Sequence, residues 1–218
     1  MKRYLKSTDI IDCAAESIKE KTKTITEGLE TDKAKAIALF YFVRDGIKFD
    51  AFAPGYVKEH YKASTILERG KGYCQHKAVL LVALARAAGI PARLGYMDIR
   101  DHSLPEKIRK MMGGDNRVFY HGYAELYMDG KWVQLSATFD LETCRRNRFV
   151  PVEFDGVKDT RDPSHDLDGK PHIEYLRDRG NYEDFPWDDI INARLEFAAQ
   201  SGKDLSQLMA DWWKNKPS

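Results

Sequence analysis

The sequence predicts a mixed protein of helices and antiparallel strands (α+β) built around one buried helix. Residues 78–85 are apolar on every side of a helix, a pattern typical of a helix enclosed by other elements. Asp129-Gly130 separates two segments rich in aromatic and branched residues, which is the strongest short signal for a β-hairpin. A chain of 218 residues is expected to bury roughly 70% of its unfolded surface. We therefore expect a single domain over 1–218.

Two helices are expected in the N-terminal part of the chain. Thr8 and Asp9 suit the cap of a first helix, because apolar residues within 10–18 recur at helical spacing. After a polar break, the same spacing over 34–44 predicts a second helix, and Gly46 ends it.

The central helix is expected to begin near Cys74. Residues 65–68 have the pattern of a capping box that opens one short helical turn, and two glycines close behind it end that turn. Gly89 suits the left-handed cap at the end of the central helix, and Pro91 prevents its continuation. Residues 93–99 are then predicted to leave as a strand.

The hairpin follows a helical insertion at 104–114. Its strands are predicted at 118–128 and 131–140, paired antiparallel. A further strand is expected at 149–154, followed by a loop dense in Asp, Gly and Pro at 155–172. Two helices are predicted to close the chain, the last with these apolar residues at helical spacing: Leu205, Leu208, Met209 and Trp212.

Composition and charge exclude several classes of protein. Lys and Arg number 35 against 34 Asp and Glu, so no overall field favours nucleic acid. The longest apolar run, 78–85, falls far short of the roughly 20 residues that span a bilayer. With no apolar segment of a secretory signal near Met1, we expect a cytoplasmic protein. Since the chain has neither C-x-x-C nor a glycine-rich phosphate motif, we predict no metal and no cofactor.

Cys74 has the surroundings of a nucleophile. It follows a glycine-rich turn and starts the central helix, where unpaired amide N–H groups and the positive end of the helix dipole favour a thiolate. Cys13 and Cys144 lie on polar-flanked segments without such glycines, and we interpret both as structural free thiols. A cysteine on a core helix is often inert, so Cys74 needs a proton-carrying partner to act.

His121 is the best candidate for that partner. His76 lies two positions from Cys74 on the same helix, roughly 200° around its axis, and cannot face the sulfur. His121 lies inside a predicted strand among aromatic residues, where it must find a hydrogen-bond partner or carry a task. The remaining histidines lie in polar, loop-like stretches: His60, His102, His165 and His172.

The predicted hairpin register places polar residues around His121. Thr138 lies directly opposite, and Ser136 and Asp140 lie on the two diagonals of the same face. Asp140 is the only acid of these three. Glu125 shares the face farther along the strand.

These residues together resemble the core of the transglutaminase-like superfamily. The resemblance rests on three segments in order: Gly72-Tyr73-Cys74, the run from Ala83 to Arg93, and the run from His121 to Trp132. A fourth segment, Arg44-Asp45-Gly46-Ile47, fits more loosely. The resemblance covers about residues 36–140, which leaves 141–218 as an extension of unknown role.

The resemblance implies a papain-like α+β fold in which a cysteine at a helix N-terminus faces a sheet that bears histidine and aspartate. Cys74 and His121 match directly. Where the family's aspartate usually falls, this chain has Ser136. We predict that Asp140 is the third catalytic residue, with Ser136, as a neutral acceptor, the alternative.

The activity that the resemblance implies is acyl transfer at an amide or peptide carbonyl through a thioester. We expect a hydrolase of peptide or protein amides, a protease or amidase, ahead of a transamidase. The alternative is a domain that binds a peptide or protein segment without catalysis, since a Cys/His pair can persist without activity.

Overall fold

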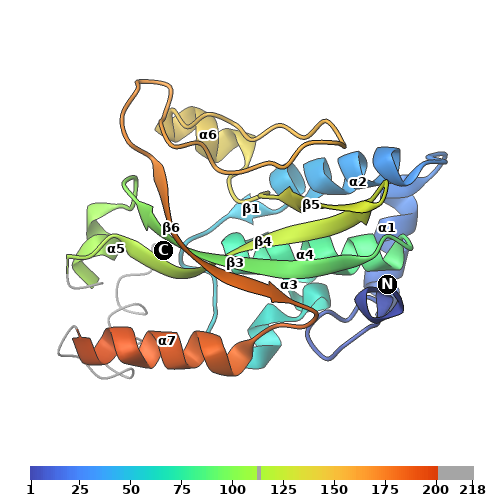
Figure 1. Ribbon diagram of the computed structural model, residues 1–218, viewed down its shortest axis with the longest axis horizontal. Helices are drawn as coiled ribbons and strands as arrows, with labels where there is room; N and C mark the ends of the chain where they lie inside the picture. Colours follow the sequence, from blue (N-terminus) through green and yellow to red (C-terminus); the bar gives the residue numbers. More distant parts are fainter. Residues whose placement is uncertain (112–113, 201–218) are drawn as a thin grey trace.

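A computed structural model describes residues 1–111 and 114–200. Four antiparallel strands form the main sheet in the order β5-β4-β3-β6 (Figure 1), and two short parallel strands form a second sheet, β1-β2. The strands are β1 (Lys48–Phe49), β2 (Lys71–Gly72), β3 (Ala92–Asp101), β4 (Arg117–Met128), β5 (Lys131–Leu135) and β6 (Ile173–Tyr182). The mixed helix and strand composition predicted from the sequence is therefore confirmed.

Seven α-helices lie within the described ranges. They are α1 (Glu16–Thr26), α2 (Asp32–Tyr41), α3 (Ala63–Arg69), α4 (Cys74–Ala87), α5 (Glu106–Met111), α6 (Leu141–Asn147) and α7 (Trp187–Gln200). Shorter turns are η1 (Lys2–Leu5), the π-turn η2 (Phe42–Gly46) and η3 (Lys58–Tyr61). No helix in the described part of the chain is both long and apolar enough to cross a membrane.

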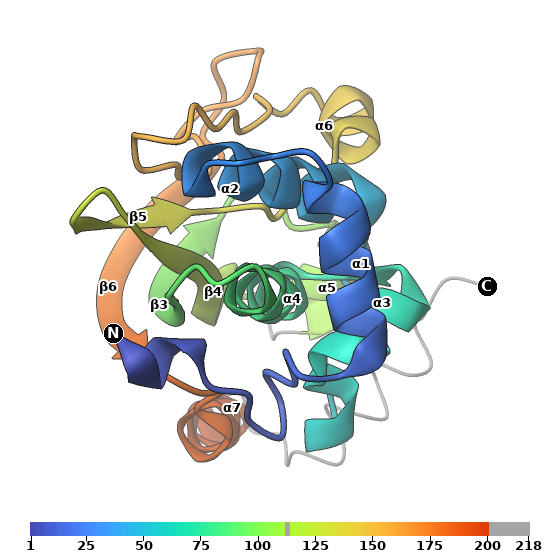
Figure 2. The ribbon, with the colours of Figure 1, turned by 90° about the vertical axis from the view of Figure 1, so that its right-hand side faces the viewer.

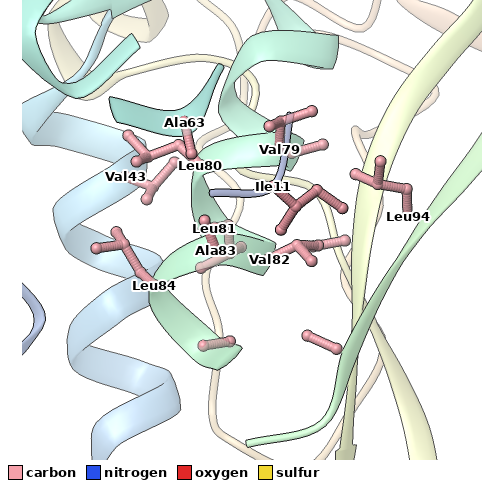
Figure 3. Close-up of a cluster of buried hydrophobic side chains, with 14 of the residues drawn as sticks. Ile11, Val43, Ala63, Val79, Leu80, Leu81, Val82, Ala83, Leu84 and Leu94 are labelled. Atoms are coloured by element: carbon pink, nitrogen blue, oxygen red, sulfur yellow. The ribbon is translucent and has the colours of Figure 1, made fainter. Parts of the chain in front are cut away.

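Helix α4 is the centre of the core. It packs on β3 and β4 on one side and on α1, α2 and α3 on the other, and Figure 2 shows it end-on in the middle of the molecule. Its residues from Val79 to Leu84 are completely buried. In the close-up, Val43 and Ala63 lie on one side of these residues and Leu94 of β3 on the other (Figure 3). A helix apolar on every side is thus enclosed on every side, as the sequence predicted.

The β4–β5 hairpin is also confirmed. Asp129 and Gly130 form its turn with φ values of 49° and 82°, the left-handed backbone that a two-residue type I′ turn requires. The register places Ala124 opposite Leu135, as the two-residue turn predicts. The second strand is shorter than expected, because beyond Leu135 the Ser136 N–H donates to Thr160 Oγ1 instead of continuing the ladder to β4.

Three other expectations were wrong or fall outside the structure. The first helix begins at Glu16 instead of following Thr8 and Asp9, although Ile10 and Ile11 are buried in the core as the periodicity suggested. Residues 149–154 form no strand. The fourth strand of the sheet is instead β6, an edge strand whose mostly exposed or half-exposed side chains give little hydrophobic pattern. The helix predicted around Leu205 to Trp212 lies outside the described residues.

Candidate active site

Cys74 is placed at the start of α4 by the small β1-β2 sheet. Phe49 of β1 pairs with Gly72 of β2, two residues before the cysteine. Gly72 must lack a side chain, because a Cβ there would lie 2.6 Å from the Cβ of His76 in the first turn of α4. The turn into the helix is therefore tight, and it presents the Cys74 sulfur beside the unpaired N–H groups of the first helical turn.

Strand β4 approaches the same end of α4 closely. A Cβ on Gly122 would lie 3.0 Å from the Gln75 Cα, so only glycine fits there without displacement. The Gln75 side-chain amide donates to the Tyr120 carbonyl at 2.8 Å and ties the helix start to the strand. His121 lies between these two attachment points on β4, next to Cys74.

A bulge in β4 orients His121. The pairing of β3 with β4 shifts from Met97 opposite His121 to Ile99 opposite Val118, which leaves one extra residue in β4. Tyr120 adopts a φ of 54°, and its N–H donates to Asp98 Oδ1 at 3.2 Å. Bulges of this kind bend a strand and change the direction of a side chain, and they are common next to active sites.

His121 joins two acidic partners. Its side chain lies beside Cys74 in the lining of one cavity, and the two groups interact electrostatically. The ring nitrogen Nε2 lies 3.2 Å from Asp162 Oδ2. The Nε2–H does not point straight at this oxygen, so the contact is chiefly electrostatic. His121 and Asp162 are both buried, at 3% and 2% exposure.

The protonation of His121 follows from these neighbours. Burial alone would lower the pKa of His121, but the negative Cys74 sulfur and the Asp162 carboxylate raise it to about 10. Burial would raise the pKa of Asp162, but contacts with His121 and Ser136 bring it below the usual value. At neutral pH the site therefore holds a buried imidazolium next to a carboxylate.

Asp162 comes from the long loop 155–172, which packs along the outer edge of β5. The Thr160 N–H donates to the Gln134 carbonyl at 2.8 Å, and the Gln134 N–H donates to Asp159 Oδ1 at 2.9 Å. The Ser136 hydroxyl then donates to Asp162 Oδ2 at 2.6 Å. Asp162 could not be singled out from the sequence, because nothing local distinguishes it from the other aspartates of the same loop.

Neither residue expected to orient His121 bonds to its ring. Asp140 is the N-cap of α6, where Oδ1 accepts from the Thr143 N–H at 3.0 Å. Its Oδ2 accepts from the Phe49 N–H of β1 at 2.7 Å. Ser136 holds Asp162 instead of bonding to His121. The structure thus brings Cys74 and His121 together, and the carboxylate beside them belongs to neither expected residue.

Lys77 lies one turn along α4 from Cys74 and is 1% exposed. Its Nζ donates to the carbonyls of Arg44 and Ile47, both at 2.9 Å. Burial lowers the pKa of Lys77 to about 7, opposed by the negative charges of Asp140 and other acids nearby. Lys77 therefore attaches the segment that leads into β1 to the helix that carries the nucleophile.

A comparison with known families fits this arrangement. The sequence model of the transglutaminase-like superfamily matches residues 19–137, more than half of the chain. This chain belongs to the transglutaminase-like superfamily. No curated protein sequence matches it significantly.

One solved structure supports the same fold for this transglutaminase-like chain. A protein named "putative cysteine protease" from Cytophaga hutchinsonii is 18% identical with a TM-score of 0.51, and the match covers 83% of this chain and 46% of that one. This chain thus spans about half the length of that protein. A protein named "putative protease" from Parabacteroides distasonis is 18% identical with a TM-score of 0.40, and the match covers 63% of this chain and 25% of that one. The papain-like α+β fold is confirmed.

The other cysteines and His76 of this transglutaminase-like domain lie outside the group formed by Cys74, His121 and Asp162. The three cysteines are free, and burial raises the pKa of Cys144 to about 11. His76 is fully buried against the Tyr61 and Tyr73 rings, and burial holds its pKa well below the usual value. Within residues 1–111 and 114–200, no group of three or more His, Cys, Asp or Glu side chains is placed to hold a metal ion.

Proposed function

We propose that Cys74, His121 and Asp162 catalyse acyl transfer at an amide or peptide carbonyl through a thioester. The observation that carries this proposal is the buried His121 ring, which lies beside Cys74 in one cavity lining and 3.2 Å from Asp162 Oδ2. A nucleophile, a proton carrier and a group that holds the carrier in place are the parts that such chemistry requires.

Each residue has a defined part in the proposed reaction. The Cys74 thiolate attacks the carbonyl carbon, and N–H groups at the start of α4 stabilise the oxyanion that forms. His121 gives its proton to the amine as the C–N bond breaks, which leaves an acyl thioester on Cys74. A second nucleophile then attacks the thioester, His121 accepts its proton, and the thiolate departs.

Asp162 takes the role that the sequence predicts for Asp140. Its carboxylate stabilises the imidazolium and fixes the ring, while Ser136 and Thr138 hold the carboxylate itself through hydrogen bonds of 2.6 and 3.3 Å. At the position where members of the superfamily usually have the aspartate, this chain has Ser136. We propose that the acid has moved to a loop that passes next to that serine.

We propose water as the second nucleophile, which makes the protein a protease or amidase. The name of the Cytophaga hutchinsonii protein supports this direction by analogy. Incubation of an amide substrate with and without a primary amine separates the alternatives. Hydrolysis predicts a free carboxylic acid in both reactions, whereas a transamidase would give the substituted amide when the amine is present.

The proposal is tested by the rate at which iodoacetamide alkylates Cys74 at pH 6, measured by peptide mass spectrometry. We expect Cys74 to react at least ten times faster than glutathione, because free thiols are almost entirely protonated at this pH. His121→Ala should remove that advantage. If Cys74 reacts no faster than glutathione and His121→Ala changes nothing, the pair is not activated, and the protein is a binding domain.

A further inference from the structure

The Cys74 sulfur and the His121 ring open into a cavity of about 320 Å³. Its walls come from residues 49–56, from β3 and β4, from α5 and from α7, so segments far apart in the sequence enclose one space. Its lining includes six large apolar side chains: Phe49, Ile99, Ile108, Phe119, Ile191 and Phe197. Its volume lies at the small end of the range for ligand sites, roughly 300 to 1,000 Å³.

The charged residues Arg117, Arg194 and Asp101 on the cavity wall already form hydrogen bonds or ion pairs within the protein. Arg194 donates to the Gly55 carbonyl at 2.8 Å and to the Tyr61 hydroxyl at 2.7 Å. Arg117 is paired with Asp115 at 2.6 Å. Asp101 Oδ1 accepts hydrogen bonds from the N–H and hydroxyl of Ser103. A charged substrate group would therefore lose its hydration in this largely apolar space, where the Arg194 N–H groups already donate to neutral acceptors.

We infer that this cavity binds a large, neutral, apolar side chain of the substrate, of the size of phenylalanine or leucine, beside the carbonyl that Cys74 attacks. This inference rests on the proposed function. Burial of such a side chain stabilises the complex by about 1.5–3 kcal/mol, which corresponds to a preference of about 10- to 100-fold over a small side chain. A charged side chain of similar size is expected to be disfavoured.

Three alkylating reagents test this inference without a known substrate. Each reacts in the same way, because the thiolate forms a bond to the CH₂ carbon as the C–I bond breaks and iodide leaves. The reagents are iodoacetamide, N-benzyl iodoacetamide and the same benzyl reagent with a carboxylate on its ring. Rates at Cys74 are divided by the rates of the same reagents with glutathione, which removes differences in intrinsic reactivity.

We expect the benzyl reagent to show at least a tenfold advantage over iodoacetamide at Cys74, and the carboxylate on the ring to remove it. Ile191→Asp on α7 places a charge on the cavity wall and should lower this advantage at least fivefold. Leu195→Asp is the matched control, because Leu195 lies one turn further along α7 and is 44% exposed outside the cavity lining. Ile191→Ala, a milder change, should lower the advantage in the same direction if the Asp variant fails to fold.

The outcomes separate this inference from the proposed function. Fast alkylation by iodoacetamide with no advantage for the benzyl reagent would overturn the inference and leave the activated Cys74–His121 pair intact. An advantage that survives both Ile191 variants would also overturn it, because another surface would then bind the ring. Slow alkylation by all three reagents would instead overturn the proposed function.

Discussion

Asp162→Asn removes the negative charge next to His121 while keeping the size of the side chain. The Asp162 side chain is completely buried and lies 3.2 Å from His121 Nε2, so no solvent can replace the lost charge at that distance. Removal of one partner from a buried ion pair costs about 3–5 kcal/mol. If the loss destabilises the imidazolium that the reaction requires by about 3 kcal/mol, the rate decreases by about 100-fold.

The assay is alkylation of Cys74 by iodoacetamide across pH 5–10, followed by peptide mass spectrometry. We expect Asp162→Asn to lose about 100-fold in rate at pH 6 and to approach the wild-type rate only above the ordinary thiol pKa of about 8.5. Asp140→Asn is the matched control, since its carboxylate bonds to Phe49 and Thr143 and should leave the pH profile unchanged. A wild-type profile for Asp162→Asn, or the loss in Asp140→Asn alone, would refute the assignment.

Two further predictions concern stability. Asp140→Ala removes the cap of α6 and the acceptor of the Phe49 N–H, so the free energy of unfolding by urea should fall by about 2–4 kcal/mol at pH 7. Burial would raise the pKa of Asp140, but its hydrogen bonds outweigh burial and lower it. The decrease in the free energy of unfolding caused by Asp140→Ala should therefore become smaller as the pH falls below about 4. A decrease that stays constant with pH would contradict this reasoning. Burial lowers the pKa of Lys77 to about 7, so the unfolded state binds more protons between pH 7 and 10. The free energy of unfolding of the wild type relative to Lys77→Met should therefore rise by up to about 3 kcal/mol over that range, and a flat difference would count against it.

The sequence alone predicted the parts of the site that depend on local pattern. An apolar run of eight residues with glycines before it and Gly89 after it locates α4, and therefore places Cys74 in its first turn. Asp129-Gly130 sets the register of the hairpin and places His121 on β4. Both signals lie within about fifteen residues of the feature that they predict.

Asp162 could not be predicted in the same way, because its position depends on contacts with distant residues. The loop that carries it is fixed by hydrogen bonds to Gln134 and Ser136, more than twenty residues earlier in the chain. Hairpin geometry favoured Asp140 because it assumed that the ladder continues to that residue. The ladder ends at Leu135, and Asp140 caps a helix instead.

The most direct test of the central claim is the protonation of the His121 ring, measured from its ¹⁵N chemical shifts and assigned with a His121→Asn variant. We predict that both ring nitrogens carry protons at pH 8, with an apparent pKa of about 10. Cys74→Ala should lower that pKa, since the sulfur makes the largest favourable contribution to it. A ring that is neutral at pH 8, or that titrates identically without Cys74, would contradict the account.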